Sequence, residues 1–341
     1  MIPHNKPTLG MEEEEAAIRV LRTDWIAQGA EVEAFENEFC DFIGLAHGHA
    51  VAVSSGTAAL FLALWVLGAK CKKIAIPVYS CSALRHAVAM AGGIEVLIDV
   101  GINSPNIDSY KLIESRAKIA IIPHMYGLPV DFQQIESENV LIIEDCAQAL
   151  GAKIADKHVG LFGKLGVFSF YATKLITTGG YGGMVVSQDK SLINSIRDYR
   201  EFDLRHDKLP RFNFKMGDIQ AAIGRVQLRK LQLFLKLRDE IFIRYKEAGL
   251  NLLDIHEKDK GHLKPVRYRA VMLTTNPLNL IKKLSSIGVS AIAPIEDWEL
   301  LGDGNFFPNA FKLSKMTVSL PIYPSLSENE VDLIIKGVLS K

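Results

Sequence analysis

The sequence predicts an α/β fold with a mainly parallel central sheet. Short apolar runs alternate with longer amphipathic stretches, and each run is continuously apolar rather than alternating with polar residues. Strands of this kind are buried on both faces, as in a parallel sheet covered by helices. The stretches between them, such as 58–67 and 83–91, have helical character, which makes the class α/β. The runs lie at 50–53, 74–76, 95–98, 119–122, 140–143 and 166–171.

The chain is expected to divide into two domains. A long helical pattern runs from Asp218 to about Lys246, and we interpret its basic face as solvated. After about residue 250 the pattern changes to short strands and helices rich in proline. We therefore predict a large domain at 1–245, with the N-terminal segment, and a smaller C-terminal α+β domain at 246–341; 341 residues suffice for both.

Composition gives no reason to expect a polymeric anion as partner. The chain has 39 basic and 39 acidic residues and a formal net charge of +0, so neither nucleic acid nor a membrane surface is indicated. The first residues do not resemble a secretory signal, and the apolar runs are too short to span a bilayer. Four scattered cysteines (Cys40, Cys71, Cys81 and Cys146) have no C-x-x-C spacing and suggest neither zinc nor a disulfide framework. A reduced, cytoplasmic setting is expected.

The segment Ser54–Leu60 (SSGTAAL) follows the first apolar run and opens a helix. Free backbone N–H groups and the positive end of the helix dipole favour an anion there. Gly56 would let the backbone approach closely, and Thr57 could add a hydroxyl. The alternative is an ordinary N-cap. The segment lacks the pattern of a P-loop.

Two adjacent carboxylates, Glu144 and Asp145, end the run at 140–143. Neighbouring strand residues point to opposite faces, so at most one of them faces a given site. A buried carboxylate needs a cationic or hydrogen-bonding partner, and a protonated pyridine nitrogen would be one. Gln148, three residues further on, could bond a ring substituent. The alternative is a structural aspartate that caps the next turn.

Lys174 follows the run at 166–171 and precedes the glycine-rich stretch 177–183 (TTGGYGG). A partly desolvated lysine offers the nucleophilic amine that a Schiff base requires. The alternative is a solvated lysine. The glycines do not match a dinucleotide-binding fingerprint.

Taken together and in this order, these segments resemble the DegT/DnrJ/EryC1/StrS family of pyridoxal-phosphate sugar aminotransferases. The resemblance covers nearly the whole chain, and it implies an aspartate-aminotransferase-like fold (fold type I). The stretches that carry it are SSGTAAL, EDCAQALGA, FSFYATK, RFNFKMGDIQAA and SLPIYP, at 54–60, 144–152, 168–174, 211–222 and 319–324.

The resemblance implies a role for each matching residue. Lys174 would form the Schiff base with pyridoxal phosphate and later carry a proton. Asp145 would face the pyridinium nitrogen, and Gln148 the phenolic oxygen. Phosphate contacts are expected from Gly56, Thr57 and Ser169.

Asn213 matches an asparagine that reaches the cofactor phosphate of the neighbouring subunit, which implies a homodimer with shared active sites. Three positions depart from the family pattern. Cys81 stands where many relatives place an aromatic ring over the cofactor, with Tyr79 nearby. Glu296 replaces the histidine of a Pro-x-His motif, and Tyr181 lies in a lengthened glycine loop without an assigned role.

The resemblance therefore implies an enzyme of amino-sugar or polysaccharide biosynthesis. It would move an amino group, expected from glutamate, to a keto-sugar that is expected to be nucleotide-linked. The alternatives are a sugar dehydratase of the same family, in which histidine replaces the lysine, and a non-catalytic sensor or scaffold that binds the cofactor. A related enzyme acting on amino acids is a third.

Overall fold

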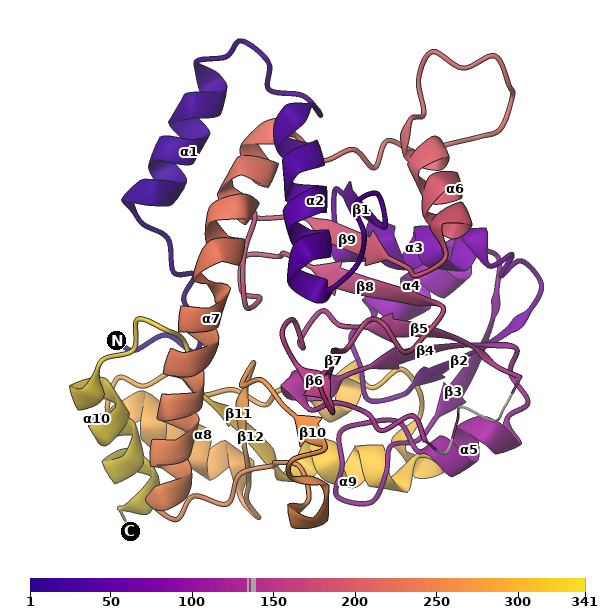
Figure 1. The fold of residues 1–341 in the computed structure, drawn as a ribbon. Coiled ribbons are helices and arrows are strands. Elements are labelled where there is room, and N and C mark those ends of the chain that lie inside the picture. Colours follow the sequence, from indigo (N-terminus) through magenta and orange to yellow (C-terminus); the bar gives the residue numbers. More distant parts are fainter. Residues whose placement is uncertain (134, 136–138, 341) are drawn as a thin grey trace.

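The computed structural model describes residues 1–133, 135 and 139–340. A seven-stranded sheet lies at its centre, in the order β1-β9-β8-β5-β4-β2-β3 (Figure 1). Neighbours from β3 through β8 are parallel, whereas β9 is antiparallel to both β8 and β1. The mainly parallel sheet is thus confirmed. Its strands are β1 (Ala50–Val53), β2 (Lys73–Pro77), β3 (Ile94–Ile98), β4 (Ile119–Pro123), β5 (Leu141–Asp145), β8 (Leu165–Ser169) and β9 (Gly183–Val186).

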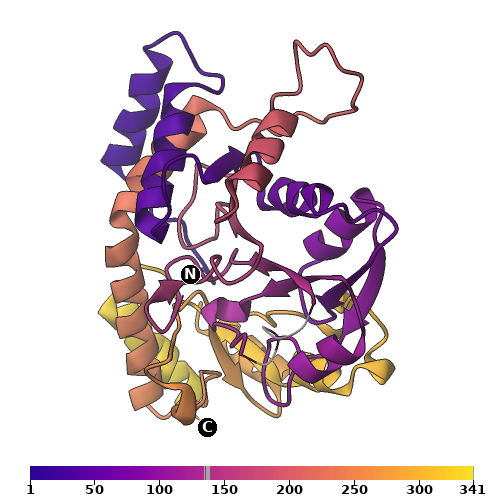
Figure 2. The ribbon, with the colours of Figure 1, turned by 45° about the vertical axis from the view of Figure 1, so that its right-hand side comes forward.

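Both faces of this sheet are buried, as the continuous apolar runs predict. Along β1, Ala50 and Ala52 belong to the core beneath helix α2 (Ala30–Ile43), whereas Val51 and Val53 belong to the core on the opposite face. Helices α3 (Gly56–Val66) and α4 (Ala83–Met90) cover that second face (Figure 2). Each strand therefore buries alternate residues in different cores.

Two sequence-based boundaries need correction. Helix α3 begins at Gly56 rather than at residue 58, because the Ser55 hydroxyl caps it by accepting the N–H of Ala58 at 3.1 Å. Strand β8 ends at Ser169, so residues 170–171 of the predicted run lie beyond it. Both shifts place polar groups at the carboxyl edge of the sheet.

Helix α7 (Asp218–Glu247) runs along most of the molecule's height (Figure 1). Its first half packs against α1 (Met11–Leu21) and α2, while Phe242 and Tyr245 near its end belong to the C-terminal core. The boundary predicted at 245/246 therefore falls in the last turn of a helix that serves both parts, and it stays a prediction.

The C-terminal part is built on the antiparallel pair β11 (Ala270–Leu273) and β12 (Thr317–Leu320). The N-terminal segment returns to it, since Ile2 forms a parallel bridge with Val289. No helix among the described ranges is long and apolar enough to cross a membrane. The remaining α-helices are α5 (Ser109–Glu114), α6 (Lys190–Arg200), α8 (Pro277–Ser286), α9 (Pro308–Met316) and α10 (Glu328–Leu339). Three short strands form a separate sheet: β6 (Lys153–Ile154), β7 (Lys157–His158) and β10 (Leu263–Lys264).

Candidate active site

The structure gathers seven of the predicted site residues around one cavity of about 430 Å³. The cavity opens where β5 and β8 end and α3 begins, at the carboxyl edge of the parallel strands, and its volume is typical of a small-molecule site. These residues are Gly56, Thr57, Cys81, Asp145, Gln148, Ser169 and Lys174.

One end of the cavity suits an anion. Gly56 and Thr57 open α3, so their backbone N–H groups have no partner within the helix. A Cβ atom placed on Gly56 would lie 2.8 Å from the Cβ of Ser169 and 3.1 Å from its hydroxyl oxygen. The absence of a side chain therefore lets the Ser169 hydroxyl approach the helix terminus. A phosphate group fits this combination of donors.

Asp145 is the last residue of β5 and is almost fully buried in the cavity wall. Its Oδ1 atom accepts the N–H of Ala147 at 3.0 Å. Burial raises the pKa of this carboxyl, although the Ala147 N–H and the positive charge of Lys174 oppose the shift. A protonated ring nitrogen would supply the cationic partner that a buried carboxylate needs.

Glu144 points to the other face of β5, as strand geometry predicts, and it does not line this cavity. Its Oε2 atom accepts the N–H of Gly160 at 2.7 Å and Nε2–H of His124 at 3.1 Å. Its Oε1 atom accepts the N–H groups of Phe162 and Gly163, both at 2.6 Å. Four donors therefore neutralise the cost of burying this carboxylate.

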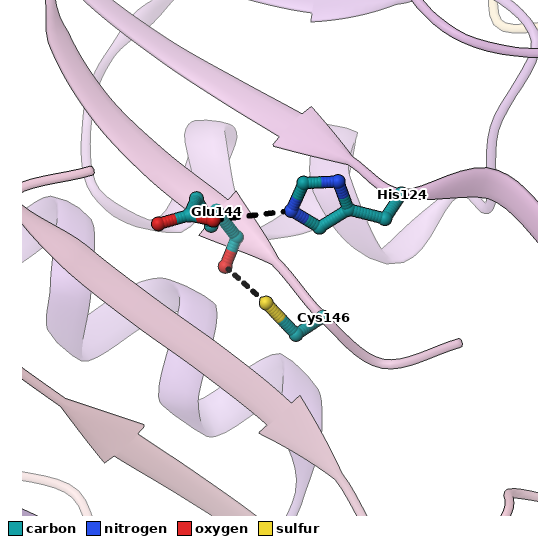
Figure 3. Close-up of side chains that lie close together, drawn as sticks. All are labelled: His124, Glu144 and Cys146. Carbon is teal, nitrogen blue, oxygen red and sulfur yellow. Dashed lines mark hydrogen bonds and ion pairs between the residues drawn. The ribbon is translucent and has the colours of Figure 1, made fainter. Parts of the chain in front are cut away.

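His124, Glu144 and Cys146 bring potential metal ligands within 4.8 Å of one another (Figure 3). Their ligand atoms are already engaged: both Glu144 oxygens accept two hydrogen bonds each, and Nδ1 of His124 accepts the N–H of Val130 at 3.0 Å. Burial raises the pKa of the Cys146 thiol well above its usual range, which disfavours the thiolate that binds metals. We interpret this cluster as a set of hydrogen bonds that joins the end of β5 to the residue after β4 and to the loop 159–163.

Gln148 is oriented by the backbone of Tyr126. Its Oε1 atom accepts the Tyr126 N–H at 2.8 Å, which assigns the other terminal atom of the amide as NH₂. That NH₂ group donates weakly to the Met125 sulfur at 3.9 Å, and its second N–H can donate to a ligand. This suits an acceptor oxygen on a ligand in the cavity. Tyr126 has a left-handed backbone (φ 61°), and its hydroxyl bonds that of Tyr79 at 2.7 Å. Tyr79 is fully buried and does not line the cavity, whereas the exposed Cys81 does.

Lys174 lies between this cavity and a second one of about 520 Å³. The second cavity shares Cys81 and Gln148 with the first and extends to Tyr268 and Arg269, just before β11. The ammonium nitrogen of Lys174 lies 5.1 Å from the centroid of the Tyr268 ring, within cation–π range. Lys174 can therefore act on ligands in both spaces.

The departures from the family pattern fall in different places. Glu296 is exposed, accepts the indole N–H of Trp298 at 2.8 Å, and does not line either cavity. Tyr181 lines the first cavity, and its ring centroid lies 5.5 Å from that of Tyr171. Asn213 is exposed in the segment between α6 and α7, and it lines neither cavity of its own chain.

The sequence did not indicate Tyr268 and Arg269 as site residues. It also did not indicate the N-terminal residues His4 and Asn5, which contact Arg269 and Thr173. The Asn5 amide donates to the carbonyl oxygen of Thr173 at 2.9 Å, directly beside Lys174. The distance from Nε2 of His4 to Nη1 of Arg269 is 3.2 Å. The only local signal is the pair of arginines at 267 and 269 ahead of an apolar strand, and it does not indicate a site.

Comparisons with known proteins agree over the whole chain. A model of the DegT/DnrJ/EryC1/StrS aminotransferase family matches residues 7–339. The spore coat polysaccharide biosynthesis protein SpsC of Bacillus subtilis is 31% identical, over 99% of this chain and 96% of that protein. GDP-perosamine synthase of Escherichia coli O157:H7 is 30% identical, over 99% and 97%. The crystal structure of the aminotransferase TlmJ from Streptoalloteichus hindustanus superposes with a TM-score of 0.92 at 26% identity, over 99% and 98%. The fold class predicted from the sequence is thereby confirmed.

Proposed function

The chain belongs to the DegT/DnrJ/EryC1/StrS aminotransferase family, and we propose on that premise that it transfers an amino group from glutamate to a nucleotide-linked keto-sugar. Members of this family of sugar aminotransferases depend on pyridoxal phosphate, which is therefore the cofactor of this chain. The names of two relatives, one in spore coat polysaccharide biosynthesis and one a GDP-perosamine synthase, support a sugar acceptor.

The position of Lys174 carries this proposal. Its side chain borders a cavity with an anion-binding end and a buried carboxylate, and also a second cavity large enough for a substrate. A Schiff-base lysine needs this arrangement, because it must bond the cofactor first and then reach the substrate. A solvated surface lysine would border neither space.

The residues of the first cavity fit pyridoxal phosphate. Gly56, Thr57 and Ser169 would hold the phosphate, Asp145 the ring nitrogen, and Gln148 the phenolic oxygen. When bound, the cofactor supplies an electron sink for the amino-bearing carbon. An ionised Asp145 would keep the ring nitrogen of the cofactor protonated.

Lys174 has two tasks in the proposed reaction. Its Nζ atom would hold the cofactor, and its amine would move a proton to and from the reacting carbon. Cys81 would lie beside the ring in place of the aromatic side chain of many relatives.

Homodimer formation is part of the proposal. Asn213 would reach the phosphate site of the partner, and the neighbouring Phe212, whose side chain is 59% exposed, offers an apolar contact. A cytoplasmic location is proposed as well. A dehydratase reaction is disfavoured because Lys174 is present where the dehydratases of the family have histidine.

The test compares the wild-type protein with Lys174→Ala and with Lys236→Ala, a control at an exposed lysine of α7. The wild-type and control proteins should show the visible absorption of a lysine-bound cofactor and lose it when glutamate is added. A nucleotide-linked keto-sugar should restore it, whereas keto acids other than 2-oxoglutarate should not. Full transamination by Lys174→Ala would refute the proposal, and restoration by the keto acids alone would favour an enzyme acting on amino acids. An unchanged spectrum with glutamate would favour a non-catalytic sensor.

A further inference from the structure

We propose that Arg269 binds a carboxylate of the amino donor in the second cavity, beside Lys174. The inference deepens the proposed function and rests on it, because it names the residue that would recognise the donor. It starts from a guanidinium that lines the cavity without an acidic partner among the described residues.

The side chains that hydrogen-bond Arg269 are uncharged. Its Nη1 atom lies 3.2 Å from Nε2 of His4 and donates to the Ser319 hydroxyl at 3.4 Å. Its guanidinium carbon lies 5.5 Å from the centroid of the Tyr268 ring. Within the part of the chain that the structure describes, no hydrogen bond is recorded for its Nε or Nη2 atoms, so one edge of the planar fork remains available.

Two nearby arginines show what a structural role looks like here. Arg267 pairs with Asp239 at 3.0 Å and with Asp254 at 2.7 Å. Arg85, which also lines the second cavity, pairs with Glu95 at 2.7 Å. Arg269 differs from both in lacking a carboxylate within 4 Å among the described residues, and so its charge is left for a ligand.

The surroundings of Arg269 are electropositive. Burial and the charges of Arg269 and Arg238 lower the pKa of His4 to about 3, so His4 stays neutral at pH 7 and accepts a hydrogen bond without adding charge. Burial would raise the pKa of Tyr268, yet the charges of Lys174 and Arg269 bring it below its usual value. An anion is favoured at such a position.

One acidic group also lines this cavity. Glu299 is exposed at the rim, and its Oε2 atom accepts the backbone N–H of Glu296 at 2.8 Å. Asp145 lies in the first cavity. Neither carboxylate lies within 4 Å of the Arg269 guanidinium, so neither accepts a hydrogen bond from its Nε or Nη2 atoms.

The geometry favours a carboxylate of the donor over other anions. Lys174 and Arg269 line this same cavity and lie 5.1 and 5.5 Å from the centroid of the Tyr268 ring, so one small molecule can place its amino group at Lys174 and a carboxylate at Arg269. A planar carboxylate can accept two parallel N–H bonds from a guanidinium. The phosphates of a nucleotide-linked sugar are the other source of anionic oxygens, and the test separates the two.

The test uses the cofactor-loaded protein with Arg269→Gln and Arg269→Lys. Arg244→Gln serves as the matched control, because it removes an arginine from an exposed pair with Asp332. Glutarate, which has the carboxylates but no amine, is titrated by calorimetry. The two half-reactions, with glutamate and with the keto-sugar, are measured separately in single turnovers.

Arg269→Gln should weaken glutarate binding and the apparent affinity for glutamate by about tenfold to a hundredfold, the loss of one charge-assisted bidentate contact. The affinities of Arg269→Lys for glutarate and glutamate should lie between those of the wild type and Arg269→Gln. The rate of the keto-sugar half-reaction should change less than about twofold in both variants. Unchanged glutarate and glutamate affinities would overturn the proposal. Weakening confined to the keto-sugar half-reaction would also overturn it and assign Arg269 to the nucleotide phosphates.

The two proposals fail in distinguishable ways. If no keto-sugar reacts with the wild-type protein, the sugar acceptor is wrong, while an Arg269-dependent affinity for glutarate still supports the anion site. If the keto-sugar reacts and Arg269→Gln leaves glutarate binding intact, the proposed function stands and the role of Arg269 is wrong.

Discussion

The adjacent carboxylates Glu144 and Asp145 allow a paired test, because they share one strand and point to opposite faces. We predict that Glu144→Gln unfolds more easily while its cofactor site stays intact. We predict the reverse for Asp145→Asn, which should lose cofactor affinity without losing stability. Each substitution changes one carboxylate oxygen to an NH₂ group.

The magnitude follows from the hydrogen bonds. In Glu144→Gln, one of the two oxygens that now accept two N–H donors each becomes a donor itself, whichever way the amide turns. Two buried donors then lack an acceptor, at about 1–3 kcal/mol each, so the free energy of unfolding should fall by about 2–6 kcal/mol. Asp145→Asn can keep its bond from Ala147 through the amide oxygen.

The pH dependence of Asp145 has the opposite sign to that of a paired carboxylate. Because burial raises its pKa in the folded state, the cofactor-free protein binds this proton more tightly when folded. Stability is therefore gained as the pH falls through the raised pKa, and lost above it. Asp145→Asn removes this penalty, so the cofactor-free variant should be at least as stable as the wild-type protein at pH 7.

The assay is urea unfolding of the cofactor-free proteins, followed by titration with pyridoxal phosphate. The urea midpoint should fall for Glu144→Gln alone, and the dissociation constant should rise for Asp145→Asn by at least tenfold. Equal losses of stability in the two variants would refute the reasoning, as would a Glu144→Gln protein as stable as the wild type.

Two further outcomes are expected. Gly56→Ala should cost about 1–3 kcal/mol of overpacking against Ser169 and weaken pyridoxal phosphate more than pyridoxal, which lacks the phosphate; equal weakening of both, measured by absorption, would contradict this. Since the pKa of His4 is about 3 when folded and about 6.5 when unfolded, the wild-type protein should lose stability as the pH falls from 6.5 towards 3. His4→Asn should flatten this decline in urea midpoints taken at pH 7.5, 5.5 and 4.5, and parallel curves would show that His4 does not cause it.

The central sheet and one wall of the site could be predicted because their signals are local. Continuous apolar runs mark strands buried on both faces, and the residues just after them reach the same edge of a parallel sheet. Gly56, Asp145 and Lys174 follow three such runs and do line one cavity. Strand β9 was not predicted, because its first residue, Gly183, still belongs to the glycine-rich stretch and only three apolar residues follow.

The other wall of the site could not be predicted, because its contacts join distant segments. His4 and Ser319 bond across 315 positions of the sequence, and Arg269 reaches both only after β11 and β12 have paired. No spacing rule relates such positions. The orientation of Glu144 was predictable, whereas its four donors were not, since the loop 159–163 supplies three of them.

The N-terminal segment has a consequence for how the chain is made. Ile2 pairs with Gly288, Val289 and Ser290, and Asn5 rests against Thr173 beside the reactive lysine. On the ribosome these early residues must wait for nearly the entire chain to emerge before their partners exist. The sheet can form while synthesis continues, but the wall beneath Lys174 closes only at its end. A stalled nascent chain would thus expose a cofactor site in which the phosphate-binding residues are in place but the contact of Asn5 with Thr173 has not formed.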